Sequence, residues 1–189
     1  MQVSIPYFSG SGHTRILAQH VAQGVDSVLG ARAVTLNVET ISPPDWDDLM
    51  RADAIIFGCP TYMGSAAAEF KAFMDETGGD LWTGLKWRDK IAAGFTVATY
   101  PSGDKLSTLM QLSVFAAQHA MIWVGQDQIG APVDASNPGI NRDGSSLGLM
   151  ATSARDKTVM IDADDAETAR RFGARIAKVA LRWRAAPAG

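Results

Sequence analysis

Residues 3–14 read VSIPYFSGSGHT, an apolar run followed at once by a loop of small and hydroxyl-bearing residues. The run Val3–Phe8 is typical of a buried strand, and the stretch Thr14–Val28 repeats apolar residues at helical spacing. The loop Ser9–Thr14 therefore connects a strand to the N-terminus of a helix. Hydroxyl donors, free N–H groups and the positive end of the helix dipole favour an anion there, and we expect the loop to bind a phosphomonoester.

The same loop differs from two common phosphate-binding motifs. It lacks the G-x-G-x-x-G pattern of dinucleotide-binding folds and the lysine of a P-loop. A phosphomonoester is therefore favoured over a dinucleotide or a triphosphate. A Ser/Gly turn that binds nothing is the alternative for the loop taken alone.

Apolar runs and helical patterns alternate along the rest of the chain. Further strands are expected at Ala33–Val38, Ala54–Cys59, Ile91–Thr99 and Met121–Val124, and further helices at Ala66–Glu76 after a Ser65 N-cap, at Leu106–Ala117, and from Asp164, with Glu167 completing a capping box, to about Trp183. The pattern predicts a flavodoxin-like α/β fold, with a doubly wound five-stranded parallel sheet, strand order 2-1-3-4-5 and helices on both faces.

Length and composition limit the classes of function. A chain of 189 residues suits one domain spanning 1–189. It has no uninterrupted apolar run of the roughly 18 residues needed for membrane insertion and no signal-peptide pattern, so we expect a cytoplasmic protein. The single cysteine, Cys59, has no partner for a disulfide or a metal site and is expected to be buried. A net charge of −3 without a basic stripe disfavours nucleic acid, and it offers little of the field by which electron carriers steer their partners.

Two segments near the C-terminus are harder to interpret. The stretch Gln126–Thr158 is rich in Gly, Asn, Asp and Ser and too long for an ordinary connection, and we interpret it as an active-site loop. The last helix carries basic side chains along one side, which we interpret as a solvated face: Arg170, Arg171, Arg175, Lys178 and Arg182.

Two more loops follow strands and should meet the first one. Residues 60–65 (PTYMGS) follow the third strand, and residues 99–104 (TYPSGD) follow the fourth. In a sheet of order 2-1-3-4-5 the carboxyl ends of these strands share one crevice. Tyr62 and Tyr100 offer flat faces on which an aromatic ring system could stack, although each tyrosine taken singly is more often a packing residue.

With these stretches the chain resembles the WrbA-type NAD(P)H:quinone oxidoreductases, within the flavodoxin-like NADPH-dependent FMN reductases. The resemblance covers nearly the whole chain and is carried by residues 9–14 (SGSGHT), 53–64 (DAIIFGCPTYMG) and 73–82 (FMDETGGDLW). It implies that residues 9–14 hold the FMN phosphate, that residues 61–63 and 97–102 hold the ring, and that Trp82 lines the nicotinamide and quinone pocket from a neighbouring subunit. A core position for Trp82 within its own chain is the alternative.

The chain departs from the family pattern at two places. After the fourth strand it has ATYPSG at 98–103 in place of a glycine-rich run, and Pro101 removes one N–H donor. The family's Ala-His-His-Gly-Met stands here as AQHAM at 117–121, so that Gln118 replaces the histidine that contacts the flavin, and a structural role for His119 stays open.

The sequence thus predicts an FMN-dependent enzyme that passes two electrons from NAD(P)H to a quinone or similar acceptor by ping-pong hydride transfer. It needs no metal and is expected to be a homo-oligomer, a dimer or a tetramer. A flavodoxin-like electron carrier, a flavin, azo or nitro compound reductase, and a flavin-free structural or signalling relative are the alternatives. The candidate cofactor-binding residues are Ser9, Gly10, Ser11, Gly12, His13, Thr14, Pro60, Thr61, Tyr62, Met63, Gly64, Val97, Ala98, Thr99, Tyr100, Pro101, Ser102, Gln118 and His119, and the candidate substrate residues are Trp82 and Ser11.

Overall fold

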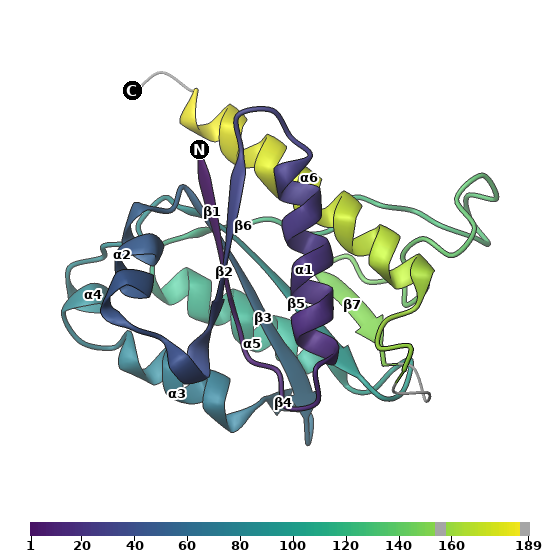
Figure 1. Cartoon of the computed structure of the whole chain (residues 1–189), viewed down its shortest axis with the longest axis horizontal. Coiled ribbons are helices and arrows are strands. Elements are labelled where there is room, and N and C mark those ends of the chain that lie inside the picture. The colour runs from purple at the N-terminus through teal and green to yellow at the C-terminus, as the bar shows by residue number, and fades with distance from the viewer. Residues whose placement is uncertain (154–157, 186–189) are drawn as a thin grey trace.

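Strands and helices alternate along the chain as the sequence predicts (Figure 1). The structure is a computed structural model and describes residues 1–153 and 158–185. The strands are β1 (Gln2–Tyr7), β2 (Arg32–Asn37), β3 (Ala54–Tyr62), β4 (Ser65–Ala66), β5 (Ile91–Ala98), β6 (Ile122–Trp123) and β7 (Leu149–Thr152). The helices are α1 (His13–Asp26), the short 3-10 helix η1 (Val38–Thr40), α2 (Pro43–Arg51), α3 (Ala68–Glu76), α4 (Asp80–Thr83), α5 (Lys105–Gln118) and α6 (Ala163–Arg184).

The sheet has the strand order β2-β1-β3-β5-β6, which confirms the predicted order 2-1-3-4-5. All pairs along this path are parallel, and the middle strands β3 and β5 are buried throughout except for the last residue of β3. Strands buried on both faces favour apolar residues over alternating ones, which is why these runs stood out in the sequence.

The fifth strand position differs from the prediction because two short strands share it. β6 pairs with the start of β5, at Ile91 and Ala92, and β7 pairs with the rest of β5 from Phe95 to Ala98. The chain leaves the sheet after β6 and returns only at β7. The sequence prediction placed one strand at Met121–Val124 and missed β7, because its four residues lie inside the Gly- and Ser-rich segment interpreted as a loop.

Helix starts were also predicted incorrectly in two cases. Ser65 does not cap α3: it lies in β4, which pairs antiparallel with the end of β3, and the N-cap of α3 is Ala67. No capping box starts α6: the helix begins at Ala163 with Asp162 as N-cap, so Glu167 lies beyond the N3 position, and it binds Arg170 and Arg171. Both segments had hydrogen-bonding alternatives that local sequence patterns do not reveal.

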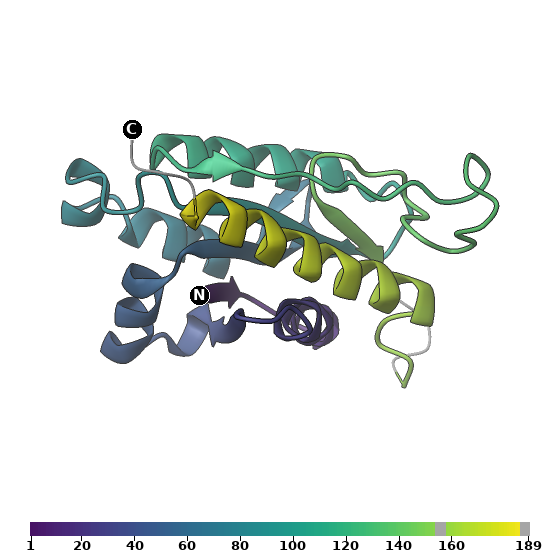
Figure 2. The same ribbon diagram turned by 90° about the horizontal axis from the view of Figure 1, so that it is seen from above.

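Helices cover both faces of the sheet (Figure 2). On one face α1 and α6 pack on residues such as Ile5, Ile56 and Phe95, and on the other face α3 and α5 pack on residues such as Ile55 and Phe57. The buried, apolar faces of β1, β3 and β5 thus fix the position of the loops that follow these strands.

Helices α1 and α6 cross at very close range. A Cβ atom on Gly24 of α1 would collide with the carbonyl oxygen of Arg170, and one on Gly173 of α6 would collide with the carbonyl oxygen of Val21. Two glycines at the crossing point therefore allow the two backbones to touch. This contact fixes the C-terminal half of α1, the helix that begins at the phosphate-binding loop.

In the described ranges 1–153 and 158–185, no helix is both long and apolar enough to cross a lipid bilayer. In the same ranges, no cluster of three or more His, Cys, Asp or Glu side chains is arranged to hold a metal ion.

Candidate functional site

The loops after β1, β3 and β5 meet at one crevice, at the carboxyl ends of these strands. Its volume is about 420 Å³. It is lined by residues that follow β1, by the last residues of β3 and β5, and by one residue that follows each of β5 and β7: Ser11, His13, Thr14, Pro60, Thr61, Tyr62, Val97, Ala98, Thr99 and Ser153. The sequence placed every one of these except Ser153 in the site.

The loop at residues 9–14 leaves the N-terminus of α1 open to a ligand. Gly12 adopts a left-handed conformation (φ 93°), which favours glycine. The N-cap residue, Gly12, has no side chain to cap α1, and no acidic residue lies in the first turn. The hydroxyl oxygen of Ser9 accepts a hydrogen bond from the Arg15 N–H at 3.1 Å, so that its hydrogen can still be donated. Thr14 is buried against the crevice. The loop therefore offers hydroxyl and backbone donors to an anion.

The side chain of Tyr62, the last residue of β3, lies over the loop at residues 9–14. A Cβ atom on Gly10 would stand 2.6 Å from the hydroxyl oxygen of Tyr62, so only glycine fits without displacing the ring. The Tyr62 side chain is 45% exposed and lines the crevice. It therefore presents an accessible aromatic face beside the proposed phosphate position.

Three buried threonines brace the floor of the crevice. The Thr61 hydroxyl bonds to the hydroxyl groups of Thr96 on β5 and Thr108 on α5, each at 2.8 Å. The Thr61 hydroxyl is therefore engaged within the protein, and its neighbours Pro60 and Tyr62 line the crevice beside it. The bonds tie the end of β3 to β5 and to α5 beside the crevice.

Several predicted residues lie outside the crevice. Met63, Gly64 and Tyr100 do not line it, and Met63 and Gly64 form a left-handed turn (φ 47° and 80°) before β4. Pro101 and Ser102 line a neighbouring groove along the start of α5. The flanking loops thus reach the rim of the crevice at both sides, and their tips are exposed.

Trp82, Gln118 and His119 gather in a separate hollow of about 290 Å³. The Trp82 indole N–H donates to the Gln118 carbonyl oxygen at 3.1 Å, and Trp82 remains 46% exposed. The hollow lies at the C-terminal end of α5, whereas the crevice lies at its N-terminal end, and a 14-residue helix is about 21 Å long. The three residues therefore cannot reach the crevice of their own chain.

His119 is held rigidly in this hollow. Its Nε2 atom bonds to the Thr77 hydroxyl at 2.9 Å, and its ring packs against Trp87 and Phe115. Burial lowers the pKa of His119, so the neutral imidazole is favoured. These contacts give His119 a structural role within its own chain.

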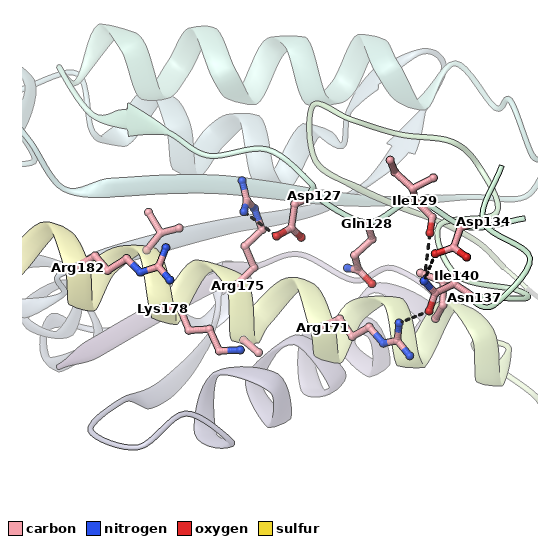
Figure 3. A pocket seen from close by; sticks show the side chains of 12 residues that line it. Asp127, Gln128, Ile129, Asp134, Asn137, Ile140, Arg171, Arg175, Lys178 and Arg182 are labelled. Atoms are coloured by element: carbon pink, nitrogen blue, oxygen red, sulfur yellow. Dashed lines mark hydrogen bonds and ion pairs between the residues drawn. The ribbon is translucent and has the colours of Figure 1, made fainter.

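Most of the segment Gln126–Thr158 is a long connection at the edge of the sheet, here called the excursion, which is bound to α6. Arg175 binds the Asp127 carboxylate at 2.7 Å and the Gly125 carbonyl at 2.8 Å, and Arg171 donates to Asn137 at 3.0 Å (Figure 3). The interpretation of the α6 basic face as merely solvated is therefore wrong for Arg171 and Arg175. Only Ser153 brings the segment to the crevice, and residues 154–157 lie outside the described part.

The crevice suits FMN in its donor set and its shape. A hydroxyl-rich helix N-terminus fits a phosphate, and the part of the crevice at the carboxyl ends of β3 and β5, here called the slot, fits a flat ring. Cys59 lies buried in β3, and burial raises its pKa to about 12, which excludes a thiolate nucleophile at neutral pH. The chemistry of the crevice is therefore that of a bound group rather than of a reactive side chain.

Comparison with known proteins agrees with this geometry. The model of the NADPH-dependent FMN reductase family matches residues 5–135, and the family's description contains the two cofactors expected from the sequence. The chain is 38% identical over 178 residues to flavodoxin FldP of Pseudomonas aeruginosa, which covers 93% of this chain and 94% of the relative.

Two further proteins connect the chain with quinone reductases and WrbA-like proteins. It is 36% identical over 146 residues to an NAD(P)H dehydrogenase (quinone) of Geobacter sulfurreducens, covering 66% of this chain and 71% of the relative. The crystal structure of a flavodoxin, WrbA-like protein from Agrobacterium tumefaciens superimposes with a TM-score of 0.74 at 36% identity, over 96% of this chain and 98% of that one. The chain belongs to the flavodoxin-like NADPH-dependent FMN reductase family.

Proposed function

We propose that this protein binds FMN in the crevice and passes two electrons from NAD(P)H to a quinone-type acceptor. The observation that carries the proposal is the convergence of an open helix N-terminus with the slot at the carboxyl ends of β3 and β5. Bound there, FMN would accept hydride from NAD(P)H and return two electrons to the acceptor.

The chain's own residues would bind and orient the flavin. Ser9 and Thr14 donate their hydroxyl hydrogens to the phosphate, while residues 60–62 and 97–99 line the ring. Tyr62, held over Gly10, restricts access from one side. The hydrogen bonds of the Thr61 hydroxyl hold the end of β3 in place beside the slot, so that FMN binding requires little rearrangement.

We further propose that the working form is a homo-oligomer with sites shared between subunits. Trp82 and Gln118, which the resemblance assigns to the flavin site, lie together but about one helix length from their own crevice. An accessible indole fixed at its N–H is suited to line a neighbouring subunit's pocket for nicotinamide and quinone.

An electron carrier is the second candidate, favoured by the 38% identity to flavodoxin FldP. Both candidates require FMN in the same crevice. They differ in whether NAD(P)H reduces the bound flavin, and the small net charge of −3 supports the enzyme because it provides little steering field for a protein partner.

The first test is the visible spectrum of the purified protein with added FMN, followed by steady-state oxidation of NADPH and of NADH with benzoquinone. The enzyme predicts sustained turnover with parallel lines in double-reciprocal plots, as expected for a ping-pong reaction. Flavin binding without NAD(P)H oxidation would identify the carrier, and failure to bind flavin would overturn both candidates. Retention of FMN on gel filtration would separate a resident cofactor from an exchangeable substrate.

The shared site is tested by mixing two variants that are each impaired in a different part of it. Trp82→Ala should raise the KM for quinone while the affinity for FMN stays near that of the wild type. Co-refolding this chain with a Ser9→Ala/Thr14→Val chain should restore activity, because some sites then combine an intact crevice with an intact Trp82. If Trp82 serves only its own chain, the variant loses stability, its quinone kinetics are unchanged, and mixing restores nothing.

A further inference from the structure

Lys105, the first residue of α5, has a completely buried side chain. Lysine is almost never fully buried unless its ammonium group is paired. Here Nζ donates to the Asp143 carboxylate, to the Ala151 carbonyl at 3.1 Å and to the Thr152 hydroxyl at 3.0 Å. All three hydrogens of the ammonium group are thus used.

The three acceptors belong to the segment that brings Ser153 to the crevice. Thr152 ends β7, and the next residue, Ser153, lines the crevice and donates its N–H to the Ala98 carbonyl at 2.9 Å. Lys105 itself follows the ring-binding loop directly, and its N–H donates to the Ser102 carbonyl at 3.1 Å. One side chain therefore connects the loop after β5 with the strand that carries Ser153.

A second pair of charges holds the same segment from the other side. Arg142, next to Asp143 in the chain, binds Asp165 of α6 at 3.0 Å, and Asp165 also accepts the Thr152 N–H at 3.0 Å. Burial raises the pKa of Asp165, while Arg142 and the Thr152 N–H oppose this shift. Thr152 is thus fixed through its side chain by Lys105 and through its main chain by Asp165.

Such a buried network contributes little net stability to a fold. Desolvation of two charges often exceeds their mutual attraction, and an apolar pair of similar volume is frequently as stable. A buried ion pair is better suited to fix one geometry. The geometry fixed here is the spacing between residues 99–104 and Ser153, on one side of the slot.

We propose that Lys105, through Asp143 and Thr152, is a positioning residue for the flavin ring. It does not line the crevice, so it acts by holding the two segments that do. The inference rests on the proposed binding of FMN. It predicts that the network contributes to ring binding and contributes nothing to phosphate binding, because the loop at residues 9–14 lies on another strand.

The test replaces the ion pair by apolar side chains in Lys105→Met/Asp143→Leu, which leaves no unpaired buried charge. Binding of FMN and of riboflavin to the apoprotein is measured by flavin fluorescence, and apoprotein stability by thermal unfolding. We expect both affinities to fall by the same factor, about tenfold or more, because the slot is no longer preorganised. The melting temperature should stay near that of the wild type.

The matched control is Arg175→Met/Asp127→Leu, which removes another ion pair between the excursion and α6 but lies away from the crevice. It should leave both affinities unchanged. If the Lys105 double variant fails to fold, Thr152→Val is used instead. It removes only the hydroxyl that Lys105 binds and should lower the affinities for FMN and riboflavin equally.

Unchanged riboflavin affinity in a folded Lys105→Met/Asp143→Leu or Thr152→Val protein would overturn the inference and leave the network a purely structural role. A loss confined to FMN would also overturn it, since the effect would then lie at the phosphate. Wild-type protein that binds neither flavin would instead refute the proposed function itself.

Discussion

The phosphate-binding loop gives the sharpest prediction, in the variant Ser9→Ala/Thr14→Val. Valine keeps the shape of the buried Thr14 side chain, so the crevice should not collapse. Each lost hydrogen bond to a charged phosphate is worth about 1.5–3 kcal/mol, and a tenfold change in affinity corresponds to about 1.4 kcal/mol. Two lost bonds should therefore weaken FMN binding roughly a hundredfold to ten-thousandfold, whereas riboflavin, which has no phosphate, should bind as before.

The assay is fluorescence titration of both flavins into the apoprotein at fixed ionic strength. The control, Thr83→Ala/Ser113→Ala, removes two exposed hydroxyls that bond only to carbonyls of their own helical turns, and both affinities should be unaffected. Equal losses for FMN and riboflavin would refute the reasoning, because they would mean that the loop supports the ring or the fold rather than the phosphate.

Three more predictions concern stability and reactivity. Gly173→Ala should lower the free energy of unfolding by about 1–2 kcal/mol in urea titrations, because overpacking against Val21 outweighs the gain in helix propensity. The control Gly79→Ala, with open space around it, should change the free energy of unfolding little. A stabilised Gly173→Ala protein would contradict the close crossing of α1 and α6. Since burial lowers the pKa of His119, the unfolded chain takes up this proton first, and stability should fall as the pH drops below about 6.5; His119→Gln should flatten that part of the profile, and an unchanged slope would argue against the assignment. The Cys59 thiol, with a pKa of about 12, should resist thiol reagents at pH 8 until the protein unfolds, and rapid labelling of the native protein would exclude its burial.

The sequence predicted the order of the sheet well, for a physical reason. Strands buried on both faces must be apolar along their whole length, and the loops that leave their carboxyl ends carry the glycines and hydroxyls that a ligand needs. The sequence alone therefore predicted the crevice residues between Ser11 and Thr99.

What the sequence did not reveal depends on contacts between distant segments. β7 is only four residues long, and its pairing with β5 comes from tertiary structure rather than from local propensity. Ser153 and Lys105 carry no motif: each gains its position from partners far away in the chain. The same holds for Arg171 and Arg175, whose role as anchors requires the excursion to fold back on α6.

The division of the fifth strand position between β6 and β7 has a consequence for the evolution and engineering of this domain. Residues 124–148 leave and rejoin the sheet along the same neighbour, β5, so the length of this excursion does not affect the register of any other strand. The entropic cost of closing a longer loop rises only slowly with length. A reporter peptide inserted beside the exposed Val133 should therefore leave the flavin crevice intact, and natural relatives can lengthen or trim this edge without rebuilding the sheet.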